Sequence, residues 1–122
     1  MVRLKRVYEE PEPGDGKRVL VDRLWPRGLT KERARLDLWS KDVAPSDGLR
    51  KWFSHDPERW TEFRKRYRLE LRSSPRKEEL ERLRALARRS SVTLLFAAKD
   101  SRHCNAAVLA EILNRGSTRS IR

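Results

Sequence analysis

The apolar residues of this chain form short continuous runs toward its two ends and helical stripes between them. Residues 92–98 are a continuous run rich in Val, Leu and Ala with one Phe, which predicts a strand buried on both faces, as in the centre of a parallel sheet. A polar turn over residues 99–105 follows, and apolar residues then return at helical spacing up to Leu113. Because open α/β sheets bind ligands at the carboxyl ends of their strands, this turn is a candidate site.

Two more strands are predicted near the start of the chain. Residues 2–8 alternate apolar and basic side chains, which indicates a strand with one wet face or at an edge. The Pro- and Gly-rich stretch 11–16 reverses the chain. Residues 18–24 then form a second strand with a buried apolar centre, and it ends abruptly at a rigid turn over residues 25–28.

The middle of the chain carries helix signals. Thr30 is expected to cap a short helix, residues 37–46 alternate as a third strand would, and Ser46 or Asp47 begins a helix that runs to Phe53. Asp56 and Pro57 are typical of a helix start. The helices 57–72 and 77–89 are expected to bury these side chains: Trp60, Phe63, Tyr67 and Leu71 in the first, and Leu80, Leu83, Leu86 and Ala87 in the second.

These elements predict one α/β domain over residues 1–122, with a small, mainly parallel central sheet flanked by helices. The strand at 19–24 is expected beside the strand at 92–98. Gly116 is placed to end the last helix, and residues 116–122 are expected to be a frayed tail.

Charge narrows the classes of partner. The net charge is +12, carried by 22 Arg and 8 Lys, so a polyanion such as nucleic acid is a candidate partner, bound by the arginine-rich face of helix 57–72. The basic residues are mixed with acids, however, and an arginine bias also arises from genome composition or growth at high temperature. No apolar run is long enough to cross a bilayer, so no membrane partner is expected.

The amino terminus lacks the apolar stretch of a secretory signal, and Cys104 is the single cysteine of the sequence. A lone cysteine cannot form an intramolecular disulfide, which agrees with a reducing compartment. We therefore expect a cytoplasmic location.

The turn after the second strand holds the first set of candidate site residues. Asp22 can orient Arg23 through an ion pair, which leaves Arg27 and the turn amides facing an anion. The alternative is that Asp22 and Arg23 form a purely structural pair and Trp25 fills the core.

The turn at 99–105 holds the second set. Cys104 follows Arg102 and His103 near a predicted helix start, surroundings that lower the pKa of a thiol and suit a nucleophile. Against this, neighbours in sequence usually point apart, and a partly buried inert thiol is the favoured interpretation. Lys99 either contacts an anion or extends outward, and Asp100 either caps the helix or acts on a substrate.

A metal site has little support in the sequence. His55, Asp56, His103 and Cys104 are available as ligands, but there is neither a repeated Cys/His spacing nor a His-Glu-x-x-His element. We expect no metal and no cofactor.

Three parts of the chain carry a family resemblance: residues 8–28, with the string Asp-Arg-Leu-Trp-Pro-Arg-Gly at 22–28, residues 44–46 with 49–51, and residues 94–100 with 107–110. They resemble the YeaO-like proteins, a bacterial branch of domain of unknown function family 488. The resemblance covers nearly the whole chain and implies a small α/β domain, with no established activity or cofactor. The wider family has a Cys-His-Arg string where this chain has Cys104-Asn105-Ala106, and that departure weakens the case for a nucleophile.

The preferred hypothesis is recognition of an anionic, phosphate-bearing or nucleotide-like small molecule in a basic pocket at two strand ends. The expected ligand-binding residues are these: Arg23, Trp25, Arg27, Lys99, His103 and Asn105. One alternative is a nucleic-acid-binding module. The other is a small hydrolase or transferase in the same pocket, with these catalytic candidates: Asp22, Lys99, Asp100 and Cys104. The sequence does not indicate an oligomeric state.

Overall fold

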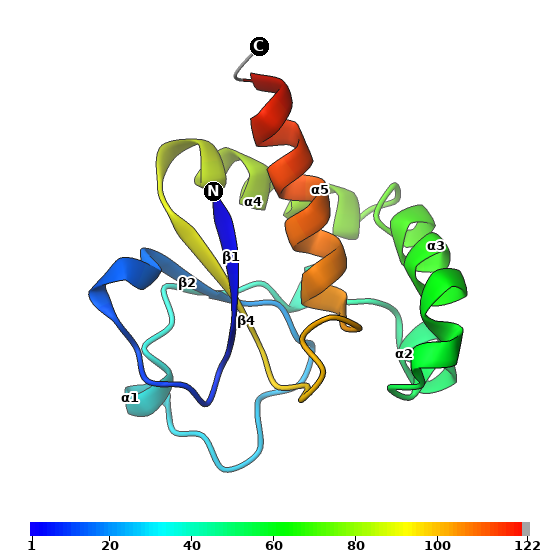
Figure 1. Cartoon of the computed structure of the whole chain (residues 1–122), viewed down its shortest axis with the longest axis horizontal. Coiled ribbons are helices and arrows are strands. Elements are labelled where there is room, and N and C mark those ends of the chain that lie inside the picture. Colours follow the sequence, from blue (N-terminus) through cyan, green and yellow to red (C-terminus); the bar gives the residue numbers. More distant parts are fainter. Residues whose placement is uncertain (121–122) are drawn as a thin grey trace.

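Four parallel strands make up the sheet of this protein, in the order β1 (Val2–Arg6), β4 (Val92–Phe96), β2 (Lys17–Leu20) and β3 (Leu38–Trp39). The structure is a computed structural model that describes the backbone of residues 1–120 and the side chains of residues 1–115. The predicted α/β fold with a parallel sheet is confirmed, and so is the pairing of β2 with β4 (Figure 1).

The strand β4 lies between β1 and β2, and all five of its residues are buried. Leu94 lies opposite Leu4 on one side and Val19 on the other. This is the environment that its continuous apolar sequence predicts. The alternating strand β1 is an edge strand, also as expected.

Side chains alternate between two cores on the two faces of the sheet. Val92, Leu94 and Phe96 belong to the large core, whereas Leu95 belongs to a smaller one. Four helices supply the large core (Figure 1): α2 (Asp47–Phe53), α3 (Trp60–Glu70), α4 (Arg76–Arg89) and α5 (Asn105–Ser120). The smaller core is closed by residues 25–39, which include the short helix α1 (Lys31–Ala34).

The helix caps follow the sequence closely. Thr30 and Ser46 each accept a hydrogen bond from a backbone amide in the first turn, of α1 and α2 respectively. Asp56 caps as expected, but the turn that it begins, Pro57–Arg59, is a short 3₁₀ helix that leads into α3.

Several expected boundaries are wrong, among them the end of β2, which lies at Leu20 and not at residue 24. Residues 37–46 form only the two-residue strand β3, followed by a 3₁₀ turn at Lys41–Val43, because the Ser40 side chain turns to hydrogen-bond Glu79 of α4 at 2.6 Å. Gly116 does not end the last helix, since α5 continues to Ser120. The expected frayed tail covered residues 116–122; the backbone of 116–120 is helical, and residues 121–122 lie outside the described residues.

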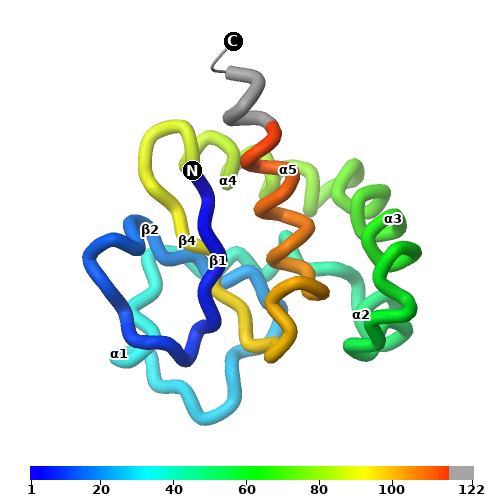
Figure 2. The backbone as a smooth tube through the Cα atoms, viewed as in Figure 1, coloured from blue at the N-terminus to red at the C-terminus, as the bar shows by residue number. Residues whose placement is uncertain are grey.

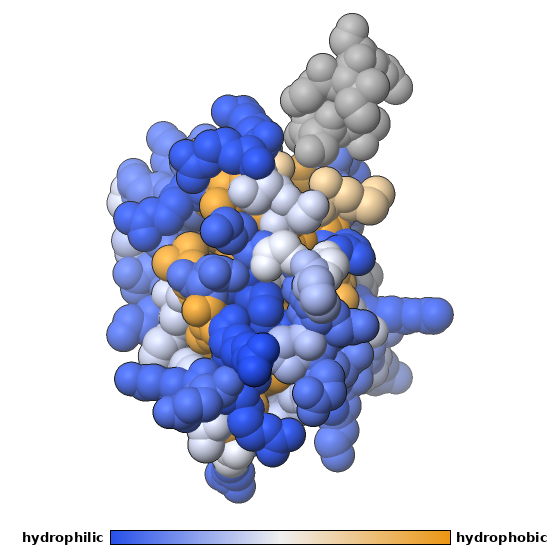
Figure 3. Space-filling model, turned by 90° about the vertical axis from the view of Figure 1, so that its left-hand side faces the viewer, coloured by the Kyte–Doolittle hydropathy of each residue, from blue (hydrophilic) through white to orange (hydrophobic). Residues whose placement is uncertain are grey.

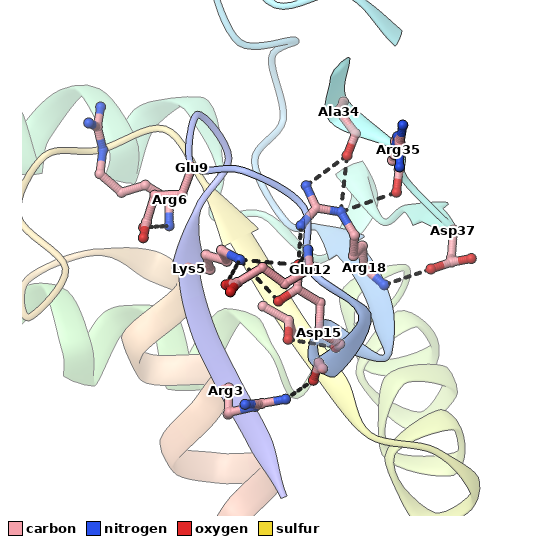
Figure 4. A network of polar contacts seen from close by, with 12 residues as sticks. Arg3, Lys5, Arg6, Glu9, Glu12, Asp15, Arg18, Ala34, Arg35 and Asp37 are labelled. Carbon is pink, nitrogen blue, oxygen red and sulfur yellow. Dashed lines mark hydrogen bonds and ion pairs between the residues drawn. The ribbon is translucent and has the colours of Figure 1, made fainter. Parts of the chain in front are cut away.

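A buried polar network fixes the loop before β2 (Figure 4). The Arg18 guanidinium donates to Asp15 Oδ2 at 2.6 Å and to the Ala34 carbonyl at 2.7 Å. Lys5 adds a bond to Asp15 Oδ1 at 3.1 Å. One buried arginine therefore ties the loop, strand β2 and the end of α1 together.

The face of the molecule seen in Figure 3 is largely hydrophilic, with small apolar patches interrupted by polar side chains. This agrees with a composition in which 39% of residues are charged. Within the described residues, no helix is both long and apolar enough to cross a membrane.

Candidate functional site

The chain leaves β2 and β4 at the same edge of the sheet (Figure 2). A cavity of about 470 Å³ lies at this edge. Small-molecule sites typically measure about 300–1,000 Å³. The lining comes from both strand ends and from the end of α2: residues 22–27, 44, 45, 50, 51, 53–55, 63, 97, 98, 104 and 105. The two turns that the sequence analysis singled out therefore meet in one recess.

The recess opens where the β2–β4 ladder stops. The last ladder bond runs from the Val21 amide to the Leu95 carbonyl at 3.1 Å. In a continued parallel ladder the Ala97 amide would next bond to the Val21 carbonyl. Instead, the Ala97 amide donates to Asp22 Oδ2 at 2.9 Å, and the Val21 carbonyl accepts from Asn105 Nδ2 at 3.0 Å. The side chains of Asp22 and Asn105 thus supply the hydrogen bonds that the two backbones no longer make to each other where the strands separate.

Asp22 is the one acidic residue among those that line the cavity. Its burial raises the pKa of the carboxyl group above the ordinary 3.8, although the Ala97 amide, the Asn105 side chain and His55 oppose that shift. The expected ion pair with Arg23 is not formed. Arg23 Nη1 instead lies 3.9 Å from Asp42 Oδ1, because Asp22 turns toward β4.

Four cationic side chains also line the cavity: Arg23, Arg27, Arg50 and Lys51. Arg50 pairs with Asp47 at 3.2 Å, yet its Nε is buried with no hydrogen-bond partner in the described part of the chain. For Arg27 and Lys51, no ion pair is present among residues 1–115. The site therefore carries more positive charge than its own acids neutralise, which favours an anion.

The buried part of the lining is apolar. Phe53 and Phe63 are only 4% and 2% exposed, and their rings stack with centroids 4.3 Å apart. Trp25 lines the opening, packs edge-on against Trp39, and donates from Nε1 to the Leu29 carbonyl at 2.6 Å. Its role is thus both structural and cavity-lining, so the two interpretations of Trp25 do not exclude each other.

The backbone beside the cavity is unusual at Ser54 and His55. Both have positive φ, 46° and 56°, and neither is glycine. A left-handed conformation is costly for such residues and persists where the surrounding structure imposes it, often at functional sites. Here it ends α2 and turns both residues into the lining of the cavity.

The expected site residues divide into two groups. Asp22, Cys104 and four expected ligand-binding or turn residues line the cavity, the four being Arg23, Trp25, Arg27 and Asn105. Three others do not line it: Lys99, Asp100 and His103. Lys99 is exposed, since the chain turns outward once the strand ends at Phe96.

Asp100 and His103 form a local turn of their own. Asp100 Oδ1 accepts from the amides of Arg102 and His103 at 3.0 and 3.2 Å, and its Oδ2 lies 2.7 Å from His103 Nδ1. The hydrogen bond from His103 holds the pKa of the Asp100 carboxyl below its usual range. Asp100 therefore occupies the backbone amides of Arg102 and His103 in this turn.

Cys104 lies at the buried side of the cavity with 3% of its surface exposed. Burial raises the pKa of its thiol to about 11, even though the Ala106 and Ala107 amides lower it. Desolvation thus outweighs the lowering of the pKa by the helix start. The surroundings of Cys104 are those of an unreactive thiol.

The sequence analysis missed the contribution of α2. Arg50, Lys51, Ser54 and His55 all line the cavity, but α2 was interpreted only as a helix with one apolar face. No local signal in the sequence places this helix end beside the two strand ends. Among the described residues, no group of three or more His, Cys, Asp or Glu side chains is placed to hold a metal ion.

Comparison with known proteins gives a consistent result. Residues 1–120 match the family described as the inactive DUF488-N3 subclade. An uncharacterized protein of Mycobacterium tuberculosis is 50% identical over 93% of each chain. The uncharacterized protein YeaO of Escherichia coli is 42% identical over 92% of this chain and 96% of its own. No solved structure matches this chain.

Proposed function

The chain belongs to the YeaO-like branch of the DUF488 family, and from that premise we propose that it binds an anionic, phosphate-bearing small molecule in the cavity at the ends of β2 and β4. The observation that carries the proposal is the charge imbalance of the lining, which holds four cationic side chains and one partly buried carboxylate. Arginine and lysine side chains bind phosphate through charge-assisted hydrogen bonds.

The unused donors support this proposal. Arg50 Nε is buried without a partner in the described residues, and a buried donor left unpaired costs about 1–3 kcal/mol. An anion in the cavity would satisfy such a donor, and it would also offset the mutual repulsion of the cations. The imposed left-handed backbone at Ser54 and His55 is a second feature that a ligand site would explain.

Binding without turnover agrees best with the chemistry of the site. Cys104 is the obvious nucleophile of the cavity, but its buried thiol has a pKa of about 11. Lys99 and Asp100, two further catalytic candidates, lie outside the lining. The word "inactive" in the description of the matched family points in the same direction.

The nucleic-acid alternative has less support. On the helix region 57–72, four of the five arginines meet acids of the same chain: Arg59 meets Asp56, Arg66 meets Glu62, and Arg64 and Arg68 both meet Glu111. Ion pairs of this kind reduce the charge available to a phosphate backbone. Retention on single- or double-stranded DNA or RNA at low salt, lost steeply as salt rises, would favour this alternative.

The proposal is tested by calorimetric titration of the protein with adenosine monophosphate and with inorganic phosphate. Arg27→Gln and Lys51→Gln should each weaken binding by about tenfold or more, since each removes a charged contact. Arg88→Gln and Lys65→Gln, exposed residues outside the cavity, are the matched controls and should leave the affinity unchanged. Equal losses in both pairs, or no binding at millimolar ligand, would refute the proposal.

A further inference from the structure

The cavity combines two kinds of surface that a bare phosphate ion would not use together. Its more exposed lining is cationic, with Arg23, Arg27 and Lys51, whereas its buried lining includes the stacked rings of Phe53 and Phe63. Ala97 and Ala98 add small side chains from the end of β4. A volume of about 470 Å³ is far larger than a phosphate group requires, since one water molecule in the liquid takes up about 30 Å³.

The partly buried Asp22 carboxylate adds a third requirement. Asp22 accepts from the Ala97 amide and is also approached by the Asn105 side chain. A carboxylate has about four acceptor positions, so these contacts leave capacity for a ligand. Because a carboxylate repels an anion, the Asp22 charge opposes anion binding unless it meets a hydrogen-bond donor of that ligand.

From these three features, and resting on the proposed anion site, we infer that the ligand is a nucleoside monophosphate, or a close chemical equivalent. Its phosphate lies among the cations, its planar heterocycle lies against the apolar wall, and an N–H group of the heterocycle donates to Asp22. A sugar phosphate offers no planar ring, and a polyphosphate chain offers neither ring nor N–H donor.

The variant Asp22→Asn tests the carboxylate directly. The Asn oxygen can still accept from the Ala97 amide, so the ladder end is retained, while the group facing the ligand loses its charge and half of its acceptor capacity. Affinity for the nucleotide should fall by about tenfold or more, the loss expected for a hydrogen bond to a charged group. Affinity for ribose 5-phosphate should stay the same or rise, because a repelling charge has been removed. A purely structural role of Asp22 would move both affinities in the same direction.

The experiment is a calorimetric comparison of the four common nucleoside monophosphates with ribose 5-phosphate and inorganic phosphate, at one ionic strength, for the wild type and Asp22→Asn. At least one nucleotide should bind about tenfold or more tightly than ribose 5-phosphate, and the variant should lose most of that difference. Equal binding of nucleotides and ribose 5-phosphate would overturn the inference and leave the anion site standing. No binding of any phosphate would overturn both.

The same chemistry could come from a free nucleotide or from the end of a nucleic acid. Titration with a six-nucleotide single strand that carries a 5′ phosphate distinguishes the two. Binding of the free nucleotide at least as tightly as the strand supports the inference. Tighter binding of the strand, with a steep loss of affinity as salt rises, would contradict it and point to a nucleic-acid end instead.

Discussion

Asp22, just beyond β2, accepts a hydrogen bond of 2.9 Å from the backbone amide of Ala97, just beyond β4. A side chain thereby takes the place of a strand carbonyl at the point where the two strands separate. The same residue faces the cavity, so one carboxylate both ends the sheet and contributes to the candidate site.

The loss of stability on substitution of Asp22 should therefore depend on the residue that replaces it. Asp22→Ala leaves the Ala97 amide without its partner, and we expect the free energy of unfolding to fall by about 1–3 kcal/mol. Asp22→Asn retains an acceptor and should cost less than half as much. Urea titration of the three proteins measures the difference, and equal stability of the Ala and Asn variants would contradict the role of this bond.

The stability difference between the wild type and Asp22→Asn should also depend on pH. Burial raises the pKa of the Asp22 carboxyl in the folded state above 3.8, so folded protein holds this proton more tightly than unfolded protein does. The contribution of Asp22 to stability is thus fully present below pH 3.8 and falls as pH rises through the folded pKa. As the pH rises through this range, the free energy of unfolding of Asp22→Asn should increase relative to that of the wild type. A constant difference would show that the carboxyl is not desolvated.

Cys104 should be unreactive in the folded protein. A thiol with a pKa of about 11 is almost entirely protonated at neutral pH, and the side chain is also buried. Iodoacetamide should modify Cys104 only slowly at pH 7.5, and rapidly once urea unfolds the chain, as mass spectrometry can follow. Rapid modification of the folded protein would show an accessible thiolate and would restore Cys104 as a candidate nucleophile.

The architecture was largely readable from the sequence. The continuous apolar run of β4 and the caps at Thr30 and Ser46 are local signals, and the structure follows each of them. The meeting of the two turns at one edge was predictable as well, because parallel strands place their carboxyl ends together. The ends of the strands were harder to predict. Strand β2 stops at Leu20, four residues before the expected end, because its neighbour β4 diverges there.

Only the part of the site at the two strand ends could be predicted from the sequence, because the part from α2 comes into place through tertiary contacts. Nothing local to Arg50 or Lys51 indicates that α2 lies beside the end of β4. Conversely, Lys99 and His103 have the right chemistry at the right point of the chain, but the turn that Asp100 closes directs them away from the lining. The partner of Asp22 was misjudged for a similar reason, since a backbone amide distant in sequence competes with the adjacent Arg23.

The buried Arg18 should be the most sensitive arginine of the described chain to substitution. Its guanidinium serves Asp15 and the carbonyls of Ala34 and Arg35 with 4% of the residue exposed (Figure 4). Arg18→Met removes the donor to the buried Ala34 carbonyl and to the Arg35 carbonyl and leaves Asp15 with Lys5 as its remaining cationic partner, and we expect a loss of about 3–5 kcal/mol in the free energy of unfolding. The exposed Arg33 is the matched control, and Arg33→Met should change stability by less than about 0.5 kcal/mol. Thermal and urea unfolding both measure this, and a loss of under 1 kcal/mol for Arg18→Met would contradict the network.

Glu111 should stabilise the contact between α3 and α5. Its carboxylate meets Arg64 and Arg68 of α3, the latter at 2.9 Å, and the hydrogen bond from Arg64 holds the pKa of Glu111 below 4.5. All three side chains are about one third exposed, so Glu111→Gln should cost only about 1 kcal/mol.

The pH dependence of that loss identifies its origin. Since the folded pKa of Glu111 is lowered, its contribution is present above pH 4.5 and disappears as pH falls through the folded pKa. Glu81, whose pair with Arg84 is 3.9 Å long, is the control, and Glu81→Gln should have no measurable effect. A Glu111→Gln loss that persists at low pH would mean that packing, and not charge, is responsible.

The most direct test of a phosphate site at the ends of β2 and β4 is an amide NMR titration of the uniformly ¹⁵N-labelled protein with adenosine monophosphate. We expect saturable amide chemical-shift changes concentrated at these residues of the cavity lining: Arg23, Ser54, His55, Ala97 and Ala98. These changes should be lost in Lys51→Gln. Shifts scattered over exposed arginines of α4, with the amides of the cavity unchanged, would contradict this prediction.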